Sequence, residues 1–278
     1  MKFPIKLNYK YVPNFLRKII PNHFSPIYLF SGQELSTANF HKAISCFKFG
    51  KTYKTTESGR HKLTNDLLLS RISKDEIILD VGASTGVTSY ELIKALNFTF
   101  SKYFITDLNL KLFYNKLGNK YFFFNESNQC ILIADEYFIV YYNELSWCKF
   151  LFRDTVSYQS KKEMNHFNLV CKDIDDLIRN DSRVVLYQFD VFKQWDHINP
   201  TIIKVANLFN LVYFSEIEVI KAFGNLFSVL KELGIIAVID NRDIEKSSIF
   251  IKEGNGVVLL ESINGGSEVQ SIIMQHFK

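Results

Sequence analysis

The sequence predicts an α/β protein whose largely parallel β-sheet lies between two layers of helices. Short apolar runs alternate with helical patterns from residue 77 onward, which is typical of parallel strands joined by crossover helices. The chain has 278 residues, 47% of them hydrophobic and 22% charged, which is ordinary for a globular protein with a full core.

The first strand is expected at residues 77–81, "IILDV", because this run of branched apolar residues is typical of a strand buried on both faces. Gly82 and Gly86 then frame a short loop, "GASTG". Because these two residues have no side chains, they would hinder neither a tight turn nor a closely bound ligand. A helix is expected over about 86–96. This strand–loop–helix unit is typical of a ligand site at a helix N-terminus.

The remaining elements of the sheet follow in order. Strands are expected in "KYFITDLNL", ending at Asp107, in "RVVLYQFDVF", ending near Asp190, and in "TIIKVANLFN", ending near Asn207. A helix over 216–233 is expected to end at a left-handed Gly234, and "GIIAVIDNR" is the fifth strand. The last segment, 256–274, predicts two antiparallel strands around a Gly265–Gly266 turn, which would place an antiparallel last strand at the sheet edge.

Residues 1–73 are expected to form an N-terminal helical cap, and residues 74–278 the main domain. The cap holds 12 Lys/Arg against 3 Asp/Glu, a charge of +9, and the rest of the chain therefore carries −5 of the net +4. A basic segment of this kind suits an anionic partner, and equally a solvated helical surface.

An insertion is expected after the second strand, because 76 residues separate Asp107 from Val184, far more than one crossover helix needs. Its aromatic-rich part, about 119–165, alternates aromatic runs with turn signals, which predicts two or three antiparallel strands and a helix around 144–155. Its rings are candidates for the roof of a small-molecule pocket, for a homodimer interface or for the core of a small subdomain; they are Phe122, Phe123, Phe124, Tyr137, Tyr141, Tyr142 and Trp147.

The cysteines indicate a reducing compartment. Cys46, Cys130, Cys148 and Cys171 are far apart and form no C-x-x-C pair, so we expect reduced thiols, a cytoplasmic protein and no metal site. No apolar run approaches the ~20 residues of a membrane span, and the charged N-terminus does not read as a secretory signal.

The glycine loop discriminates between two classes of nucleotide-like ligand. A dinucleotide fingerprint is G-x-G-x-x-G, whereas the last glycine of G-A-S-T-G comes one residue too early. Asp80 lies directly before the loop, where a carboxylate would repel a diphosphate but suit a cationic amino-acid group.

Over about residues 74–278 the chain resembles the class I S-adenosylmethionine-dependent methyltransferases, small bacterial members in particular. "LDVGASTG" resembles their first motif, "TDL" the acid after the second strand, and "FDV" the polar residue after the third. The resemblance implies a three-layer αβα Rossmann-like methyltransferase sheet that binds S-adenosylmethionine. "GGSE" near the C-terminus is also familiar from such proteins, with no role attached.

The resemblance also implies roles for individual residues. Gly82, Ala83 and Gly86 would let the backbone approach the cofactor, Asp107 would bind the ribose hydroxyls, and Asn207 would face the methyl-donating end. The spacing supports the second role independently, because Asp107 lies 21 residues beyond Gly86, near the ~20 expected for a ribose-binding acid. The full set of expected cofactor residues is Asp80, which would fix the amino-acid end, Gly82, Ala83, Ser84, Gly86, Asp107, Leu108, the adenine-lining Asp190 and Val191, and Asn207.

The catalytic residues stay unassigned. His61, His166 and the Tyr213/Phe214 pair are candidates at the active face, and Arg60 is a candidate for the cofactor carboxylate. Methyl transfer from a sulfonium needs mainly alignment, so no base is obligatory. The Asn-Pro-Pro-Tyr type motif of amino-methylating DNA and protein enzymes is missing, which disfavours a planar exocyclic amine as the acceptor. The expected acceptor is an oxygen or nitrogen of a small molecule. RNA is the alternative acceptor, and a non-catalytic protein that keeps the fold is a third hypothesis.

Overall fold

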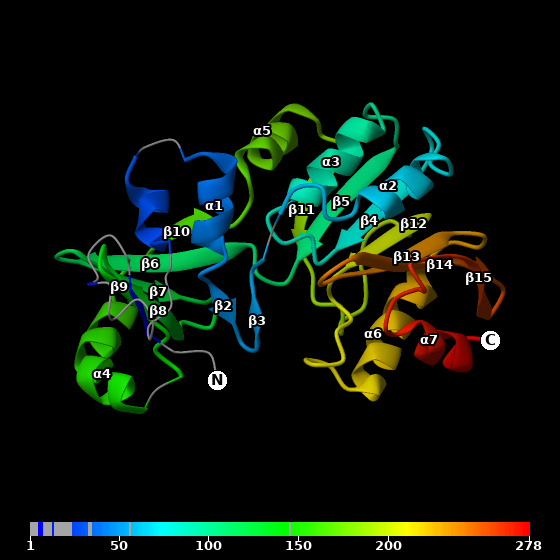
Figure 1. Ribbon diagram of the computed structural model, residues 1–278. Coiled ribbons are helices and arrows are strands. Elements are labelled where there is room, and N and C mark those ends of the chain that lie inside the picture. The colour runs from blue at the N-terminus through cyan, green and yellow to red at the C-terminus, as the bar shows by residue number, and fades with distance from the viewer. Residues whose placement is uncertain (1–4, 8–12, 14–23, 33–34, 56, 145) are drawn as a thin grey trace. The chain divides into compact units, whose positions relative to one another are not determined.

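The computed structural model describes residues 5–7, 13, 24–32, 35–55, 57–144 and 146–278 (Figure 1). These residues divide into two compact units, each built from two stretches of the chain. Unit 2 comprises 57–108 and 170–278, and unit 1 comprises the described part of 1–56 together with 109–169. No helix among these residues is long and apolar enough to cross a bilayer.

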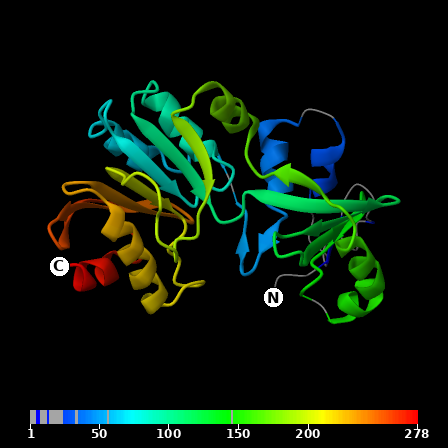
Figure 2. The same ribbon diagram turned by 180° about the vertical axis from the view of Figure 1, so that it is seen from behind.

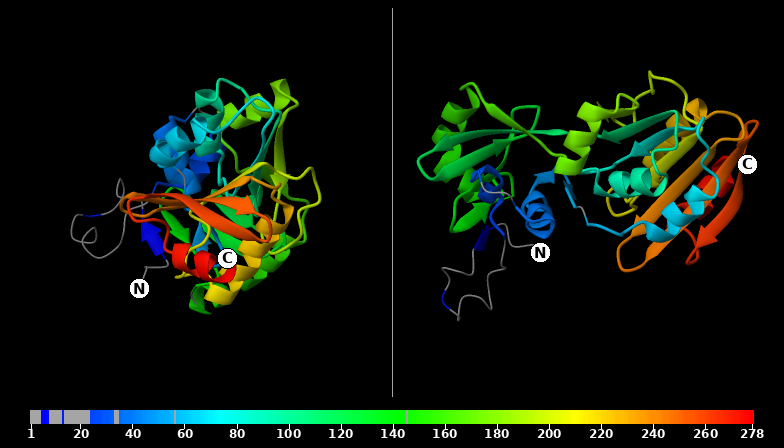
Figure 3. Two further views of the ribbon diagram at one scale, coloured as in Figure 1. Left: turned by 90° about the vertical axis from the view of Figure 1, so that its right-hand side faces the viewer. Right: turned by 90° about the horizontal axis from the view of Figure 1, so that it is seen from above.

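Unit 2 contains a seven-stranded sheet with helices on both faces, which confirms the predicted three-layer α/β class (Figures 1 and 3). In spatial order the strands are β11 (Val184–Gln188), β5 (Lys102–Asp107), β4 (Ile77–Val81), β12 (Ile202–Ala206), β13 (Ile235–Asn241), β14 (Glu245–Glu253) and β15 (Gly256–Ile263). The helices are α2 (Lys62–Leu69), α3 (Val87–Ala95), α5 (Lys172–Asn180), α6 (Glu216–Val229) and α7 (Gln270–His276). The first five strands are parallel, and β4 lies between β5 and β12, so the chain reverses its direction across the sheet at β4.

Side-chain alternation along β4 explains why its two faces differ. Ile77, Leu79 and Val81 belong to the core cluster that includes the buried side of α6. Ile78 and Asp80 point to the opposite face and are both fully buried. A strand covered on both sides reads as a continuous apolar run, so the one acid in it is conspicuous.

Two expectations for the C-terminal part are wrong in detail. The hairpin turns at Gly254–Asn255, between β14 and β15, whereas Gly265–Gly266 leads into helix α7 (Figure 2). The strand antiparallel to the five parallel ones is therefore β14, and the last strand, β15, is antiparallel to β14.

The end of helix α6 also differs from the expectation. α6 ends at Val229, and Leu233, not Gly234, adopts the left-handed conformation. Gly234 is needed for space instead, since a Cβ there would lie 2.7 Å from the Leu230 Cδ1 atom and from the Lys231 carbonyl oxygen.

Unit 1 contains an antiparallel sheet of six strands, three of which lie wholly within residues 119–165, in agreement with the two or three expected there. Its spatial order is β1 (Ile5–Leu7), β9 (Phe138–Val140), β8 (Cys130–Ala134), β7 (Lys120–Phe124), β6 (Lys111–Leu117) and β10 (Asn165–Asn168). Other elements of the unit are the 3-10 helix η3 (Pro26–Phe30), helices α1 (Thr37–Ile44) and α4 (Ser146–Ser160), and the short pair β2 (Lys48–Phe49) and β3 (Thr52–Tyr53).

The expected boundary at residue 73 is not where the units divide. The described residues up to 55 belong to the same unit as the insertion, because β1 pairs with β9 and because Ile44 and Phe47 join a core with Phe123. The helix α2 belongs to unit 2. The sequence could not show this, since β1 and β9 are far apart along the chain.

Most of the aromatic run in the insertion forms the interior of unit 1. Phe122, Phe123, Phe124 and Tyr141 are buried, which supports the subdomain-core interpretation for these rings. Tyr137 is exposed, and the side chain of Trp147 lies outside the described residues. Cys46, Cys130 and Cys171 are buried free thiols, and burial raises their pKa values to about 12, 12 and 11.

Candidate functional site

The loop between β4 and α3 has the backbone shape that its glycines predict. Gly82 and Gly86 have φ angles of +75° and +78°, and Ser84 shares the left-handed region at +57°. The Ala83 N–H donates to the Thr106 carbonyl at 2.9 Å, which ties the loop to β5. Glycine is favoured at position 86 for two reasons: its left-handed φ angle, and the lack of space for a Cβ, which would lie 2.7 Å from the Ile174 Cγ1 atom of α5.

Asp107 meets this loop from the end of the neighbouring strand. Its Oδ2 atom accepts a hydrogen bond from the backbone N–H of Ser84 at 2.9 Å. The Ser84 hydroxyl is buried and has no partner among the described residues. Leu108, the next expected site residue, is 52% exposed, and its carbonyl accepts from the Gln188 amide at 2.9 Å. Asp107 therefore lies next to the glycine loop.

Asp80 lies in a different environment from the one its expected role requires. Its carboxylate is fully buried under α3, where Oδ2 accepts from the Ser89 hydroxyl at 2.8 Å and the Tyr103 hydroxyl at 3.0 Å, and lies 3.3 Å from the Lys204 ammonium. Burial and, secondly, the Asp80 charge raise the pKa of Tyr103. Oδ1 has no partner among the described residues.

Lys204 is a functional candidate that the sequence interpretation missed. It is fully buried in the middle of β12, directly opposite Asp80 in the strand register. A lysine inside the apolar run "IIKVA" was the available signal, because a lysine is almost never fully buried unless it is paired.

Asp190 and Val191 follow β11, as expected; Asp190 forms a local turn, and Val191 packs in the core. Asp190 Oδ1 accepts from the Phe192 N–H at 3.0 Å, a short turn of the kind Asp commonly forms. The Val191 side chain is buried in the core, and its carbonyl accepts from Asn225 of α6 at 3.0 Å.

A hydrogen-bonded group of four residues lies at the ends of β12 and β13: Asn207, His61, Asn241 and Arg60. Asn207 has a left-handed φ of +54°, and its Oδ1 accepts from the Asn241 N–H at 2.7 Å. Its Nδ2 lies 3.0 Å from the His61 Nε2 atom. Arg60 Nη2 donates to the Asn241 carbonyl at 2.5 Å, and the Asn241 amide donates back to the Arg60 carbonyl. Three residues that were singled out separately in the sequence thus come together, and Asn241 joins them.

The charge state of His61 follows from its surroundings. The side chain is 3% exposed, and its Nδ1 atom is buried without a partner among the described residues. Burial, then the charges of Lys204 and Arg60, lower its pKa to about 2. The ring is therefore neutral at any pH at which the protein would work.

Glu245, another residue that the sequence interpretation missed, holds the start of α2 and with it His61. The side chain of the N-cap residue, His61, makes no capping bond, and the carboxylate of Glu245 on β14 accepts from the N–H groups of Leu63 and Thr64 at 2.9 and 2.8 Å instead. This replaces the local cap with one from a distant strand.

The GGSE turn has a structural role in the same unit. Glu268 Oε1 accepts from the Leu211 N–H at 2.8 Å and from Arg242 at 2.6 Å, and the Glu268 N–H donates to Asp240 at 2.7 Å. Burial raises the pKa of Asp240. The turn therefore joins the segment after β12 to the end of β13.

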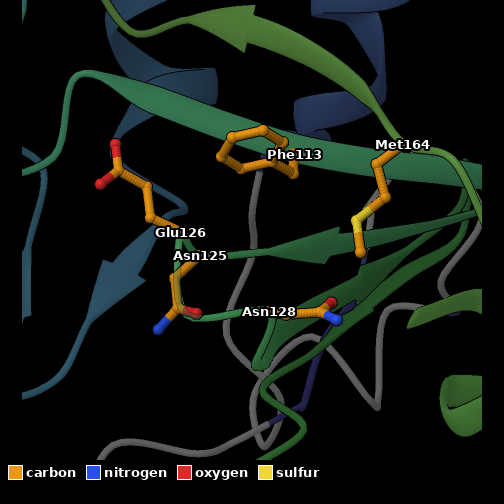
Figure 4. A pocket seen from close by; sticks show the side chains of 5 residues that line it. All are labelled: Phe113, Asn125, Glu126, Asn128 and Met164. Atoms are coloured by element: carbon orange, nitrogen blue, oxygen red, sulfur yellow. The ribbon is translucent and has the colours of Figure 1, made fainter. Parts of the chain in front are cut away.

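The other candidates do not join this group. Phe214 packs on the core of unit 2, with its ring 5.7 Å from that of Phe192. His166 is an exposed residue of β10 in unit 1. Unit 1 also holds a pocket of about 290 Å³, lined by Phe113, Asn125, Glu126, Asn128 and Met164 (Figure 4).

The sheet order and the loop define unit 2 as a Rossmann-like α/β domain with a candidate ligand site where the strand order reverses, beside the carboxyl ends of β4, β5 and β12. Among solved structures the chain is similar to S-adenosylmethionine-dependent methyltransferases, while no family model and no curated protein matches it. The fold assignment rests on the strand order described above.

Three of these solved structures illustrate the similarity. The methyltransferase SibL is 12% identical over 65% of this chain and 36% of its own, with a TM-score of 0.32. Phosphoethanolamine N-methyltransferase 1 of Haemonchus contortus, solved with phosphoethanolamine and S-adenosylhomocysteine, is 15% identical over 66% and 27%, with a TM-score of 0.35. The N-methyltransferase NodS of Bradyrhizobium japonicum is 11% identical over 68% and 72%, with a TM-score of 0.34. The chain spans less than half the length of the first two.

Proposed function

We propose that unit 2 binds S-adenosylmethionine and that the protein transfers its methyl group to an oxygen or nitrogen of a small molecule. One observation carries the proposal: Asp107, at the end of β5, is hydrogen-bonded to the Ser84 N–H of the left-handed glycine loop at the reversal point of the sheet. An acid suited to binding ribose hydroxyls and a loop whose backbone would admit a close ligand thus lie next to each other.

Each part of the cofactor would meet a different element. The loop from Gly82 to Gly86 would face the amino-acid end, and Asp107 would accept from the ribose hydroxyls, since a carboxylate offers about four acceptor positions. Asp190 and Val191 would border the adenine, and Asn207 the methyl-donating end. Asp80 is reassigned in this proposal: paired with Lys204 and Ser89, it supports the loop and α3 from within the core.

The loop favours a sulfonium nucleotide over a dinucleotide. In a G-x-G-x-x-G loop the second glycine lets the backbone approach the diphosphate, whereas G-A-S-T-G has Ser84 at that position and its last glycine one residue too early. The antiparallel β14 beside β13 agrees with the methyltransferase resemblance as well.

The protein's contribution to transfer would be alignment. When bound, S-adenosylmethionine supplies an activated methyl group, and the chain's residues orient the acceptor in line with it and exclude water. The acceptor class is inferred from what is missing in the sequence, where "VANLFNLV" replaces an Asn-Pro-Pro-Tyr type motif. The buried free thiols agree with a cytoplasmic location.

Calorimetric titration with S-adenosylmethionine, S-adenosylhomocysteine and NAD tests the cofactor. We expect micromolar binding of both sulfur ligands and none of NAD, and Asp107→Ala should weaken the binding at least about tenfold by removing hydrogen bonds to a charged group. Asp75→Ala, an exposed acid before the other end of β4, is the matched control and should bind as the wild type does.

Two outcomes would redirect the proposal. A folded protein that binds neither sulfur ligand would contradict it. Binding without methyl transfer to any member of a broad acceptor panel would favour a non-catalytic role, and RNA binding that weakens steeply with salt would favour RNA as the acceptor, in line with the basic residues 1–73.

A further inference from the structure

The orientation of the Asn207 amide fixes which nitrogen of His61 carries the proton. Asn207 Oδ1 accepts from the Asn241 N–H, so the Nδ2 end of the amide is the one that faces His61. Nδ2 is a donor only, and the His61 Nε2 atom 3.0 Å away must therefore be the acceptor.

A neutral imidazole that accepts at Nε2 carries its hydrogen on Nδ1. Nδ1 is buried and has no partner among the described residues. A buried N–H without an acceptor is costly, and such groups in native proteins are nearly always satisfied by a ligand, water or protein atom. The Nδ1–H of His61 thus points to a missing acceptor.

The charges around the ring indicate what kind of acceptor fits. The groups that act on His61 electrostatically are both cations, Lys204 on β12 and Arg60 next to it in the chain. Lys204 is paired with Asp80; Arg60 is acted on electrostatically by Glu57, while its described side-chain hydrogen bond is to the neutral Asn241 carbonyl. A positive environment around an N–H donor favours an anionic oxygen.

We propose that His61 is a positioning residue: Asn207 holds it as the Nδ1–H tautomer, and the ring donates this hydrogen to the carboxylate at the amino-acid end of the bound cofactor. The inference rests on the proposed function and deepens it. It also removes His61 from the candidate bases, since Nδ1 already holds a proton and Nε2 is engaged by Asn207.

The tautomer is measurable on the wild-type protein alone. In ¹⁵N-labelled protein we expect one of the histidines to show a protonated Nδ1 and an unprotonated Nε2, without titration between pH 5 and 8. The signal is assigned by its loss in His61→Asn. A doubly protonated ring at pH 6, or a proton on Nε2, would overturn the inference.

The ligand contact is tested by a double-mutant cycle between His61 and the ligand carboxylate. The probes are S-adenosylmethionine and its decarboxylated analogue, titrated into the wild type and His61→Leu. The wild type should prefer the carboxylate-bearing ligand, and this preference should fall at least about tenfold in the variant, as for a charge-assisted hydrogen bond. His61→Asn, whose amide N–H lies near the Nδ1 position, should restore part of it.

The outcomes separate the two proposals. Failure of the wild type to bind either ligand would contradict the proposed function. Binding of both ligands with the same preference in the wild type and in a folded His61→Leu would overturn the role of His61 and leave the cofactor assignment intact.

Discussion

The two units bury different kinds of groups. Unit 1 is filled mainly with hydrocarbon and aromatic side chains, and its buried Asp135 is satisfied within its own turn by the N–H groups of Tyr137 and Phe138. The side-chain amide of Gln159 is also buried there, without a partner among the described residues. Unit 2 buries the ion pair of Asp80 and Lys204 and the unpartnered Nδ1 of His61. A buried ion pair is weak evidence for stability, because desolvation offsets its attraction. Both units therefore bury unsatisfied polar atoms, but the buried ion pair lies in unit 2, the unit to which we assign the proposed cofactor site.

The largest expected effect is on the ion pair of unit 2. Lys204→Met leaves Asp80 as a buried, uncompensated charge, so we expect unit 2 to lose about 3–5 kcal/mol of stability. The measurement is urea unfolding followed by probes in each unit, with the unit 1 transition unchanged. The double variant Asp80→Asn/Lys204→Met is the control and should recover most of the loss; an equally unstable double variant would contradict the charge explanation.

The corresponding change in unit 1 is Leu132→Ala in β8, a fully buried position. Removing this side chain should cost about 2–5 kcal/mol in the unit 1 transition through lost apolar burial and a cavity. Binding of S-adenosylmethionine below the transition should stay at the wild-type affinity. A variant that folds but has lost its affinity would break the division of roles between the units.

Gly86→Ala tests how much the close packing of the glycine loop against α5 contributes to stability. The alanine would have to adopt a φ of +78°, and its Cβ would collide with Ile174. We therefore expect the free energy of unfolding to fall by about 1–3 kcal/mol, more than the left-handed conformation alone costs. Gly59→Ala is matched to it, with a φ of +75° and no atom within 4 Å. Equal melting temperatures for the two variants would show that packing against α5 is unimportant.

Acid should destabilise unit 2 through His61. The unfolded ring binds a proton below its ordinary pKa of 6.5, while the folded ring stays neutral to about pH 2, so this contribution to stability is complete above pH 6.5 and declines as the pH falls. Between pH 7 and pH 5 the decline amounts to about 2 kcal/mol. Urea unfolding at pH 7 and pH 5 gives the fall in unfolding free energy between them, which should be about 2 kcal/mol smaller in His61→Gln than in the wild type. An equal fall in both proteins would mean that His61 does not titrate as described.

The smallest effect is expected on the surface of unit 1. Phe150 of α4 is 83% exposed, so Phe150→Ser should change stability by less than about 0.5 kcal/mol. Analytical ultracentrifugation of wild type and variant also tests the homodimer interface, one of the three interpretations of the aromatic insertion. A wild-type dimer that dissociates in the variant would assign the interface to α4.

Local patterns predicted most of the sheet of unit 2, because buried parallel strands and their crossover helices are encoded in short stretches. The strands at 77–81 and 202–206 and the loop at Gly82 and Gly86 all follow from neighbouring residues. The Asp80–Lys204 pair could not be predicted in this way, since it depends on the register of two strands far apart in the chain. For the same reason the capping of α2 by Glu245 was missed.

For a related reason, the sequence did not predict that strands from outside residues 119–165 complete the sheet of unit 1. Its pairing of β1 with β9 depends on contacts between the beginning and the middle of the chain. Alternation within the insertion indicated only the strands that are joined by short turns, such as β7 and β8.

The interleaving of the two units has a consequence for biosynthesis. Strand β1 leaves the ribosome early, but its partner β9 is made only after the glycine loop and Asp107 of unit 2 have emerged. Unit 2 in turn stays incomplete until β11 to β15 follow. Neither unit can therefore finish folding before most of the chain exists, and the exposed apolar strands of the nascent protein would be natural clients for chaperones.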